Sequence, residues 1–180
     1  ICRALIVLNN IKILIVDLDG TLIKTDMLYE TFWSAFSLDW KNPFKAVLAF
    51  LAGMANLKNF LDKHSEIDVE TLPYNRSVLE YIESHRLKFK KVILVTGSNE
   101  AIAKRISKHL GLFDEVHGSN GKVNLKGKNK AKFLNKTYGF KNYDYLGNSS
   151  SDLHIWRTCN KAITHNATRW LRHKCEAINK

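Results

Sequence analysis

One segment near the start of the chain, ILIVDLDGTL at residues 13–22, constrains the fold more than any other. Its apolar run from Ile13 to Val16 predicts a strand buried on both faces. The polar residues follow where the strand ends, which is where open α/β sheets hold their ligands. Asp17 and Asp19 share one side of an extended chain because side chains alternate along it. Two such carboxylates suit either a hard cation or a nucleophile paired with a general acid.

Further apolar strands alternate with helix patterns along the chain. The predicted strands span residues 11–16, 91–96, 113–118, 143–146 and 162–164. The predicted helices between them span residues 77–86, 100–110, 128–138, 153–158 and 168–177. This alternation predicts an α/β fold, with a three-layer Rossmann-like parallel sheet flanked by helices.

Residues 27–64 have helical apolar spacing but fall between the first strand and Pro73. Asn42-Pro43 indicates a helix start, and we expect one helix from Phe44 to Leu57. The chain is therefore divided into a core, residues 1–26 and 73–180, and a small helical insertion, residues 27–72.

The DLDGTL segment at residues 17–22 resembles motif I of the haloacid dehalogenase superfamily, in the form that its phosphatases carry. The resemblance implies that Asp17 attacks phosphorus and becomes an aspartyl phosphate. It also implies that Asp19 is the acid and base, and that Mg²⁺ is the cofactor. The insertion then corresponds to a C1 cap, which covers the site and selects substrates.

Thr96-Gly97-Ser98 follows the second predicted strand and resembles motif II of the same superfamily. A hydroxyl group and turn amides before a helix form an anion site. The resemblance implies that Thr96 binds the phosphoryl group through its hydroxyl. Gly97 and Ser98 would add main-chain contacts to the substrate phosphate.

A cation is required beside these groups, because Asp17 and the phosphate repel each other. Lys126 fits motif III best, as a catalytic and phosphate-binding lysine, and Lys128 and Lys130 are its competitors. The remaining lysines of this stretch are expected on a solvated face.

Residues 147–152, GNSSSD, resemble motif IV but carry Asn148 where an acid is usual. The resemblance implies metal ligands from Asp17, the Asp19 carbonyl and Asn148, with Asp152 close by or bound through water. An amide oxygen can bind Mg²⁺ but brings no charge, so we expect weakened Mg²⁺ binding.

Several segments also resemble phosphatase domains fused to UbiA-type prenyltransferases, namely residues 71–75, 110–116, 124–127 and 152–156. This similarity implies a larger, membrane-linked parent protein, with association through flanking segments. The cysteines Cys2, Cys159 and Cys175 have no metal or disulfide spacing, which suits a reducing, cytoplasmic compartment.

The insertion is strongly aromatic, with Trp33, Phe36, Trp40, Phe44 and Phe50. These rings either pack in the core of the cap or contact an aromatic or apolar leaving group. Phosphotyrosine and a prenyl phosphate are examples of such substrates. A third reading is that the predicted helix touches a membrane, but its polar face is not clearly basic.

The formal charge of +11 favours anionic partners. A basic C-terminal segment with Arg169, Arg172 and Lys174 suits an anionic membrane surface or, as a rival, nucleic acid. Nothing in the sequence resembles a zinc finger, an RNA-recognition motif or a basic leucine-zipper region. We expect a Mg²⁺-dependent phosphatase acting on a phosphorylated small molecule or phosphoprotein. Phosphotransfer to another acceptor is one alternative. The other is a catalytically weak phosphate-binding or membrane-docking module.

Overall fold

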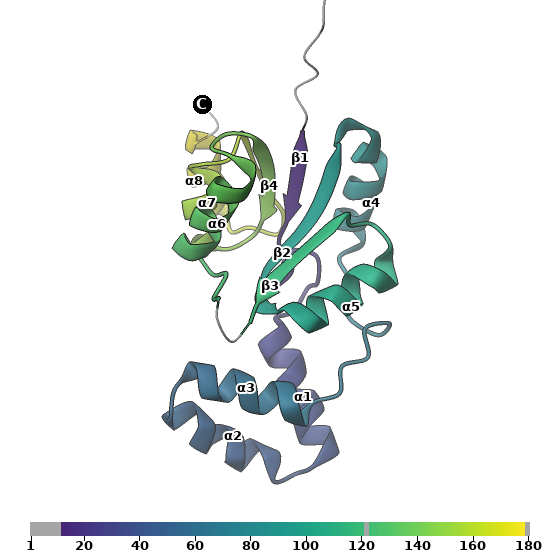
Figure 1. Ribbon diagram of the computed structural model, residues 1–180, viewed down its shortest axis with the longest axis vertical. Coiled ribbons are helices and arrows are strands. Elements are labelled where there is room, and N and C mark those ends of the chain that lie inside the picture. Colours follow the sequence, from purple (N-terminus) through teal and green to yellow (C-terminus); the bar gives the residue numbers. More distant parts are fainter. Residues whose placement is uncertain (1–11, 121–122, 179–180) are drawn as a thin grey trace, which may run out of the picture.

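Five parallel strands in the order β3-β2-β1-β4-β5 form the centre of the computed structural model, which describes residues 12–120 and 123–178 (Figure 1). The strands are β1 (Ile13–Val16), β2 (Lys91–Asn99), β3 (Glu115–Ser119), β4 (Tyr143–Gly147) and β5 (Lys161–Thr164). The central strand β1 pairs with both β2 and β4, so Val16 lies beside Leu94 and Leu146. The segments that follow these three strands therefore meet at one edge of the sheet.

Helices cover both faces of this sheet, which confirms the predicted α/β class (Figure 1). One face packs against α4 (Arg76–His85) and α5 (Glu100–Leu110). The other packs against α6 (Lys128–Tyr138), α7 (Leu153–Trp156) and α8 (Arg169–Ile178). Two short 3₁₀ turns, η1 (Arg86–Lys88) and η2 (Ser150–Asp152), complete the lobe. Alternate residues of β1 serve the two faces, since Leu14 and Val16 belong to one core and Ile15 to the other.

The observed elements agree with the predicted ones to within a few residues at their ends. Helix α5 ends where predicted, because Gly111 adopts a left-handed φ of +67°. Strand β2 extends three residues beyond the predicted Thr96, to Asn99. Residues 1–11 of the predicted core, including Cys2, lie outside the described residues, whereas Cys159 and Cys175 are buried against the sheet.

Three helices form the smaller lobe, here called the cap: α1 (Met27–Leu38), α2 (Asn42–Leu51) and α3 (Met54–His64). The single helix predicted from Phe44 to Leu57 is wrong. It is interrupted at Gly53, whose φ of +120° is open to glycine but strained for other residues. The chain reverses there and α3 packs back against α2.

Most of the aromatic residues of the cap are exposed. The buried residues of its hydrophobic core are Ala35, Ala46 and Leu61, with Phe32 and Phe60 among the partly buried apolar neighbours. The rings expected to pack in this core, or against a leaving group, are instead exposed: Trp33, Phe36, Trp40, Phe44 and Phe50. The reading that they pack in the core of the cap is therefore wrong for these five residues, whereas their contact with a leaving group stays a prediction. Among the described residues, no helix has the length and apolar character needed to cross a bilayer.

Candidate active site

The loop after β1 brings two carboxylates to the edge of the sheet. The main-chain N–H of Asp17 donates to the carbonyl of Leu146 at 3.0 Å, which ties the loop to β4. Leu18 points into the core, so Asp17 and Asp19 both line the same cavity. Gly20 makes the turn with a left-handed φ of +73°. The pairing of the two carboxylates on one side is therefore as the alternation predicts.

Asp17 forms a buried ion pair with Lys130. The Nζ of Lys130 lies 2.6 Å from Oδ1 of Asp17, and both side chains are buried. Burial raises the pKa of Asp17 to about 7, while the Lys130 ammonium opposes that rise. Burial alone would lower the pKa of Lys130, but the neighbouring Asp17 and Asp152 carboxylates raise it overall. Lys130 is therefore a charged lysine that favours the ionised form of Asp17.

The lysine in contact with Asp17 is thus Lys130, and not the expected Lys126. Lys130 lies in the first turn of α6, which packs on the sheet and directs the side chain inward. Lys126 precedes that helix and is separated from it by Gly127, which has a left-handed φ of +53°. Lys126 is exposed and packs beside Gly97, where an added side-chain carbon would lie 3.5 Å from the Cβ of Lys126. Lys126 still lines the same cavity, so its contact with a substrate phosphate stays a prediction.

The carboxylate of Asp19 accepts three hydrogen bonds. Its Oδ2 accepts from the hydroxyls of Thr96 at 3.0 Å and Ser98 at 2.7 Å. Its Oδ1 accepts from the main-chain N–H of Met27, at the start of the cap, at 2.8 Å. Burial nevertheless raises the pKa of Asp19, against the lowering effect of these donors. Asp19 is therefore held rigidly, with a pKa that favours proton transfer more than that of an exposed aspartate does.

These contacts bear on the predicted phosphate-binding residues. Thr96 is fully buried, and its hydroxyl both donates to Asp19 and accepts from the N–H of Ser98 at 2.9 Å. Gly97 and Ser98 line the cavity. In this structure Thr96 positions Asp19 and is not among the residues that line the cavity, and contact of Thr96, Gly97 and Ser98 with a substrate phosphate stays a prediction.

The segment after β4 is organised around Asp152. Its Oδ2 accepts from the main-chain N–H groups of Asn148 at 3.0 Å and Ser149 at 2.9 Å. Its Oδ1 accepts from the hydroxyl of Tyr145 at 2.9 Å. Asp152 is buried and its oxygens have protein partners, so it shapes the loop that carries Asn148.

The donor set of this edge fits Mg²⁺ only with help from main-chain or water oxygens. Within the described residues, no three His, Cys, Asp or Glu side chains could hold a metal together. Of the two predicted side-chain ligands, Asp17 lines the cavity, whereas Asn148 is not among the lining residues, packs against Gly20 and accepts from Thr21 at 3.3 Å. Mg²⁺ tolerates this, because it usually keeps several waters and takes one or two carboxylates. The predicted ligands therefore fit a weakly held ion.

The cavity above these residues is about 760 Å³ and lies between the sheet edge and the cap. This volume is in the range of small-molecule sites. The cap contributes residues from α1 and α3 to its lining: Met27, Leu28, Thr31, Lys58, Asn59 and Asp62. Asp62 accepts from Asn99 at 2.7 Å and the Nζ of Lys58 lies 3.4 Å from the carbonyl of Gly97, so α3 is joined to the motif II turn. No aromatic side chain of the described residues lines this cavity.

Sequence reasoning missed Tyr145 and the α3 residues. The hydroxyl of Tyr145 links Lys130, at 3.2 Å, with Asp152. Its spacing from Gly147 places both on one face of β4, which could have suggested a polar group beneath the site. The roles of Lys58 and Asp62 depend on how the cap sits over the sheet, which no local pattern indicates.

Known proteins share both the sequence pattern and the fold. A family model of haloacid dehalogenase-like hydrolases matches residues 14–157. The uncharacterized protein y4nM of Sinorhizobium fredii is 35% identical over 150 residues, which make up 83% of this chain and 29% of that protein. The chain thus spans less than a third of the length of this relative.

Solved structures resemble the fold at low sequence identity. A protein of unknown function from Bordetella pertussis matches with a TM-score of 0.70 and 15% identity, over 92% of this chain and 95% of that one. A phosphoserine phosphatase, solved with an analogue of its phospho-aspartyl intermediate, matches with a TM-score of 0.61 and 16% identity, over 91% and 90%. With the family model matched over residues 14–157, which include the cap and strands β2 to β4, the chain belongs to the haloacid dehalogenase-like hydrolases.

Proposed function

We propose that this domain is a Mg²⁺-dependent phosphomonoester hydrolase that works through an aspartyl phosphate. The observation that carries the proposal is the buried Asp17–Lys130 pair beside a fully hydrogen-bonded Asp19. The two carboxylates share one cavity but have different partners, as a nucleophile and an acid require. The phosphoserine phosphatase that shares this fold was solved with such an intermediate analogue, which supports the assignment.

In the first step an oxygen of Asp17 attacks phosphorus, and the bond from phosphorus to the leaving oxygen breaks. Asp19, whose pKa is raised by burial, gives its proton to that oxygen. In the second step water attacks phosphorus, Asp19 takes a proton from it, and phosphate leaves Asp17. Mg²⁺ bound by Asp17, Asn148 and the Asp19 carbonyl would supply positive charge to the phosphoryl oxygens.

Lys130 keeps Asp17 ionised for attack and adds positive charge next to the transferring group. Lys126, with Gly97 and Ser98, is proposed to bind the phosphate on the other side of the cavity. The catalytic lysine of the proposal is therefore Lys130, and Lys126 retains a binding role.

The leaving group would meet the cap residues Lys58, Asn59 and Asp62, together with Met27 and Leu28. Three of these five side chains are polar or charged, which supports a leaving group that carries hydrogen-bonding groups. A phosphotyrosine or prenyl phosphate substrate has less support, because the cap rings lie outside the cavity lining. The fusion to a prenyltransferase and the cytoplasmic location stay predictions from the sequence.

Hydrolysis of an aryl phosphate with and without Mg²⁺ tests the proposal. We expect metal-dependent turnover that falls by at least about a thousandfold in Asp17→Asn, because the nucleophile is lost. Asn148→Asp should keep activity and lower the Mg²⁺ concentration for half-maximal rate by about tenfold, since it adds a charged ligand.

One observation favours a second candidate, a phosphate-binding module with little turnover: the neutral Asn148 at the metal position. Absence of turnover in both the wild type and Asn148→Asp, across aryl, serine-like and prenyl phosphates, would favour that module. Phosphate binding measured by calorimetry would then be the remaining activity.

A further inference from the structure

Helix α2 presents its large apolar residues to solvent. Phe44, Val47, Leu48 and Leu51 follow the spacing i, i+3, i+4, i+7 and therefore form one stripe. Their exposed fractions lie between 57% and 76%. The buried positions of the helix hold Asn42 and Ala46 instead. This is the reverse of an ordinary surface helix, in which the apolar stripe faces the core.

Rings of α1 and the following turn extend this stripe. Trp33 lies 6.0 Å from Tyr29 and 5.7 Å from Phe36, measured between ring centroids. Trp40 lies 6.2 Å from Phe44 in the same way. We call the whole set the outer cap surface, and its members are Tyr29, Trp33, Phe36, Leu38, Trp40, Phe44, Val47, Leu48, Phe50 and Leu51.

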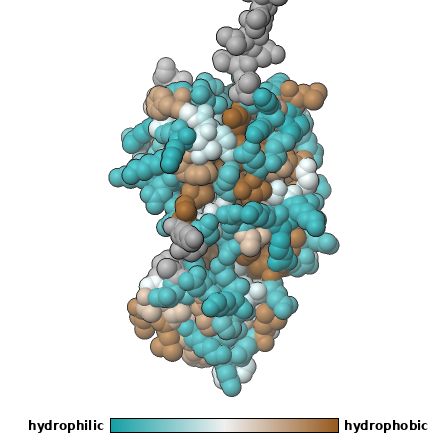
Figure 2. Space-filling view, in the orientation of Figure 1, coloured by the Kyte–Doolittle hydropathy of each residue, from teal (hydrophilic) through white to brown (hydrophobic). Residues whose placement is uncertain are grey.

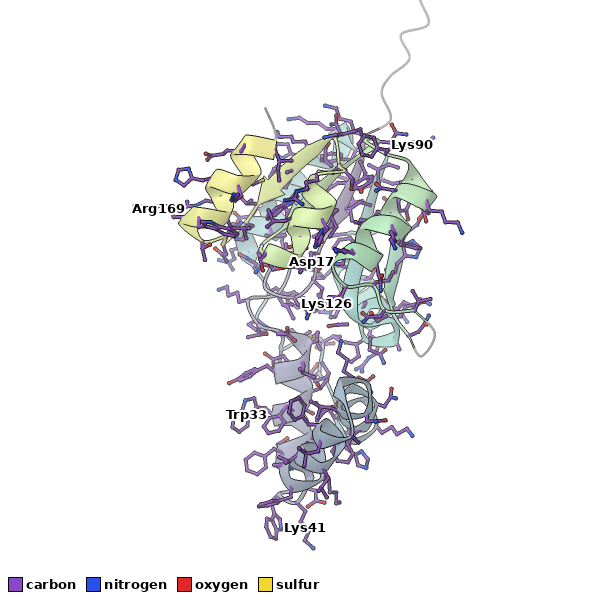
Figure 3. All side chains as sticks on the ribbon, turned by 90° about the vertical axis from the view of Figure 1, so that its left-hand side faces the viewer. Asp17, Trp33, Lys41, Lys90, Lys126 and Arg169 are labelled. Atoms are coloured by element: carbon purple, nitrogen blue, oxygen red, sulfur yellow. The ribbon has the colours of Figure 1, made fainter. Side chains whose placement is uncertain are left out.

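The outer cap surface lies away from the active site. Figure 3 shows Trp33 on the flank of the cap and Lys41 at its far end, with Asp17 in the other lobe. Hydrophobic residues gather along the margin of the lower lobe in Figure 2. The cavity is lined by other α1 residues, Leu28 and Thr31 among them. Exposed apolar surfaces of this kind often mark interaction sites, which makes the outer cap surface a candidate for contact with a partner other than the substrate.

The chemistry of the surface fits the interface of a lipid bilayer. Tryptophan and tyrosine rings favour the headgroup level, and aliphatic side chains favour the acyl boundary. Lys41 and Lys45 flank the stripe, and residues 40–61 contain no Asp or Glu. The ammonium of Lys41 lies 5.8 Å from the ring of Trp40. Long lysine side chains beside apolar residues can reach lipid phosphates while their stems stay buried.

Charge favours the lipid through the two lysines at the stripe, Lys41 and Lys45. The formal charge of +11 lies outside the cap, whose residues 27–72 carry four lysines against six acidic residues, and it opposes the approach of an identical molecule only at long range. The acidic residue next to the stripe, Asp39, already has Lys45 as a partner at 3.4 Å. The surface sits at a projecting end of the molecule, where it can meet a flat bilayer without a steric clash from the sheet lobe (Figure 1).

We propose that the outer cap surface docks this protein on anionic phospholipid bilayers, with the rings and aliphatic side chains inserted at the interface. This proposal does not depend on the phosphatase assignment.

Vesicle flotation of the whole chain tests the proposal, using phosphatidylcholine with about 30 mol% phosphatidylglycerol. The test variant is Phe44→Ser, Leu48→Ser, Leu51→Ser, which changes exposed residues only. The matched control is Leu87→Ser, Phe140→Ser, Trp170→Ser, which removes three exposed apolar residues from the sheet lobe. We expect the test variant to lower the partition coefficient by about a hundredfold and the control to leave it within about twofold.

Two further readouts identify the surface. Brominated lipids should quench Trp33 and Trp40 in the wild type, and Trp33→Phe with Trp40→Phe should remove that quenching. Lys41→Gln with Lys45→Gln should lower binding to anionic vesicles by about tenfold or more, with little change on pure phosphatidylcholine. Circular dichroism spectra and soluble aryl phosphate hydrolysis serve as controls for folding.

Two results would overturn the proposal. In the first, binding persists in the test variant but is lost in Arg169→Gln, Arg172→Gln, Lys174→Gln, so the basic C-terminal segment docks instead. In the second, the wild type does not bind vesicles and forms a dimer, whereas the test variant is a monomer. The outer cap surface would then be an interface between two copies.

Discussion

The sheet edge and the cap differ in which side chains they bury. At the edge, Asp17, Lys130 and Asp152 are buried charges, and each is hydrogen-bonded within the protein. In the cap, small residues such as Ala35 and Ala46 are buried while most of the large rings are exposed. The edge therefore has an internal network that fixes its geometry, and the cap has a thin core and an apolar outside. The two proposals rest on this difference, since they assign chemistry to the edge and contact with other molecules to the cap.

The largest expected effect is a loss of activity in Lys130→Met, and it distinguishes Lys130 from Lys126. Loss of the ammonium beside Asp17 should lower kcat by about a hundredfold to a thousandfold. Lys126→Met should mainly raise KM, by about tenfold or less, because that side chain is exposed at the cavity wall. Steady-state kinetics at saturating Mg²⁺ measure both.

The pH profile provides a second readout of the same pair. Asp17 must be ionised to attack, and Lys130 opposes the rise of its pKa toward about 7. Removal of Lys130 raises that pKa further, so the acidic limb of kcat/KM should move to higher pH. An unchanged limb, with kcat lost instead in Lys126→Met, would return the catalytic role to Lys126.

A core substitution in the cap sharpens the comparison of the lobes. Leu61→Ala removes one of the few buried side chains of the cap and should destabilise it by roughly 2–4 kcal/mol. Hydrogen exchange should accelerate in α1, α2 and α3 while β1 and β2 remain protected. Leu87→Ala, at a fully exposed position, is the control and should change neither lobe. Equal acceleration in the sheet would show that the two lobes unfold as one unit.

The smallest effect concerns single hydroxyl groups. Tyr145→Phe removes the link between Lys130 and Asp152 and should lower the free energy of unfolding by roughly 1–3 kcal/mol. Tyr143→Phe is the matched control in the same strand, with the neutral partners Asn135 at 2.9 Å and Thr158 at 3.1 Å. It should cost about 0.5–1.5 kcal/mol. Urea unfolding of both variants checks the difference, and equal costs would mean that the charged network adds no stability.

Much of the sheet lobe was predictable from local patterns. Apolar runs and backbone preferences predict the strand ends, the order of the motifs and the glycine that ends α5, Gly111. Neighbouring residues set each of these features. The placement of Asp17 and Asp19 on one side follows from the strand period. These predictions agree with the structure because each feature depends on only a few neighbouring residues.

The choice between Lys126 and Lys130 could not be made that way. Both are lysines in one polar stretch, and the contact depends on where α6 begins and how it packs on the sheet. The same holds for Tyr145, whose partners come from α6 and from the loop after β4. Contacts between distant segments are set by packing, which no local spacing encodes.

The sequence by itself determined that this chain carries an α/β sheet with an aspartate pair at the end of its first strand. Only the tertiary structure decided which lysine meets that pair and which way the cap rings point. The physical reason is that helical periodicity tells which residues share a face, but not what that face meets. In α2 the large residues lie on the face that the rest of the cap leaves open.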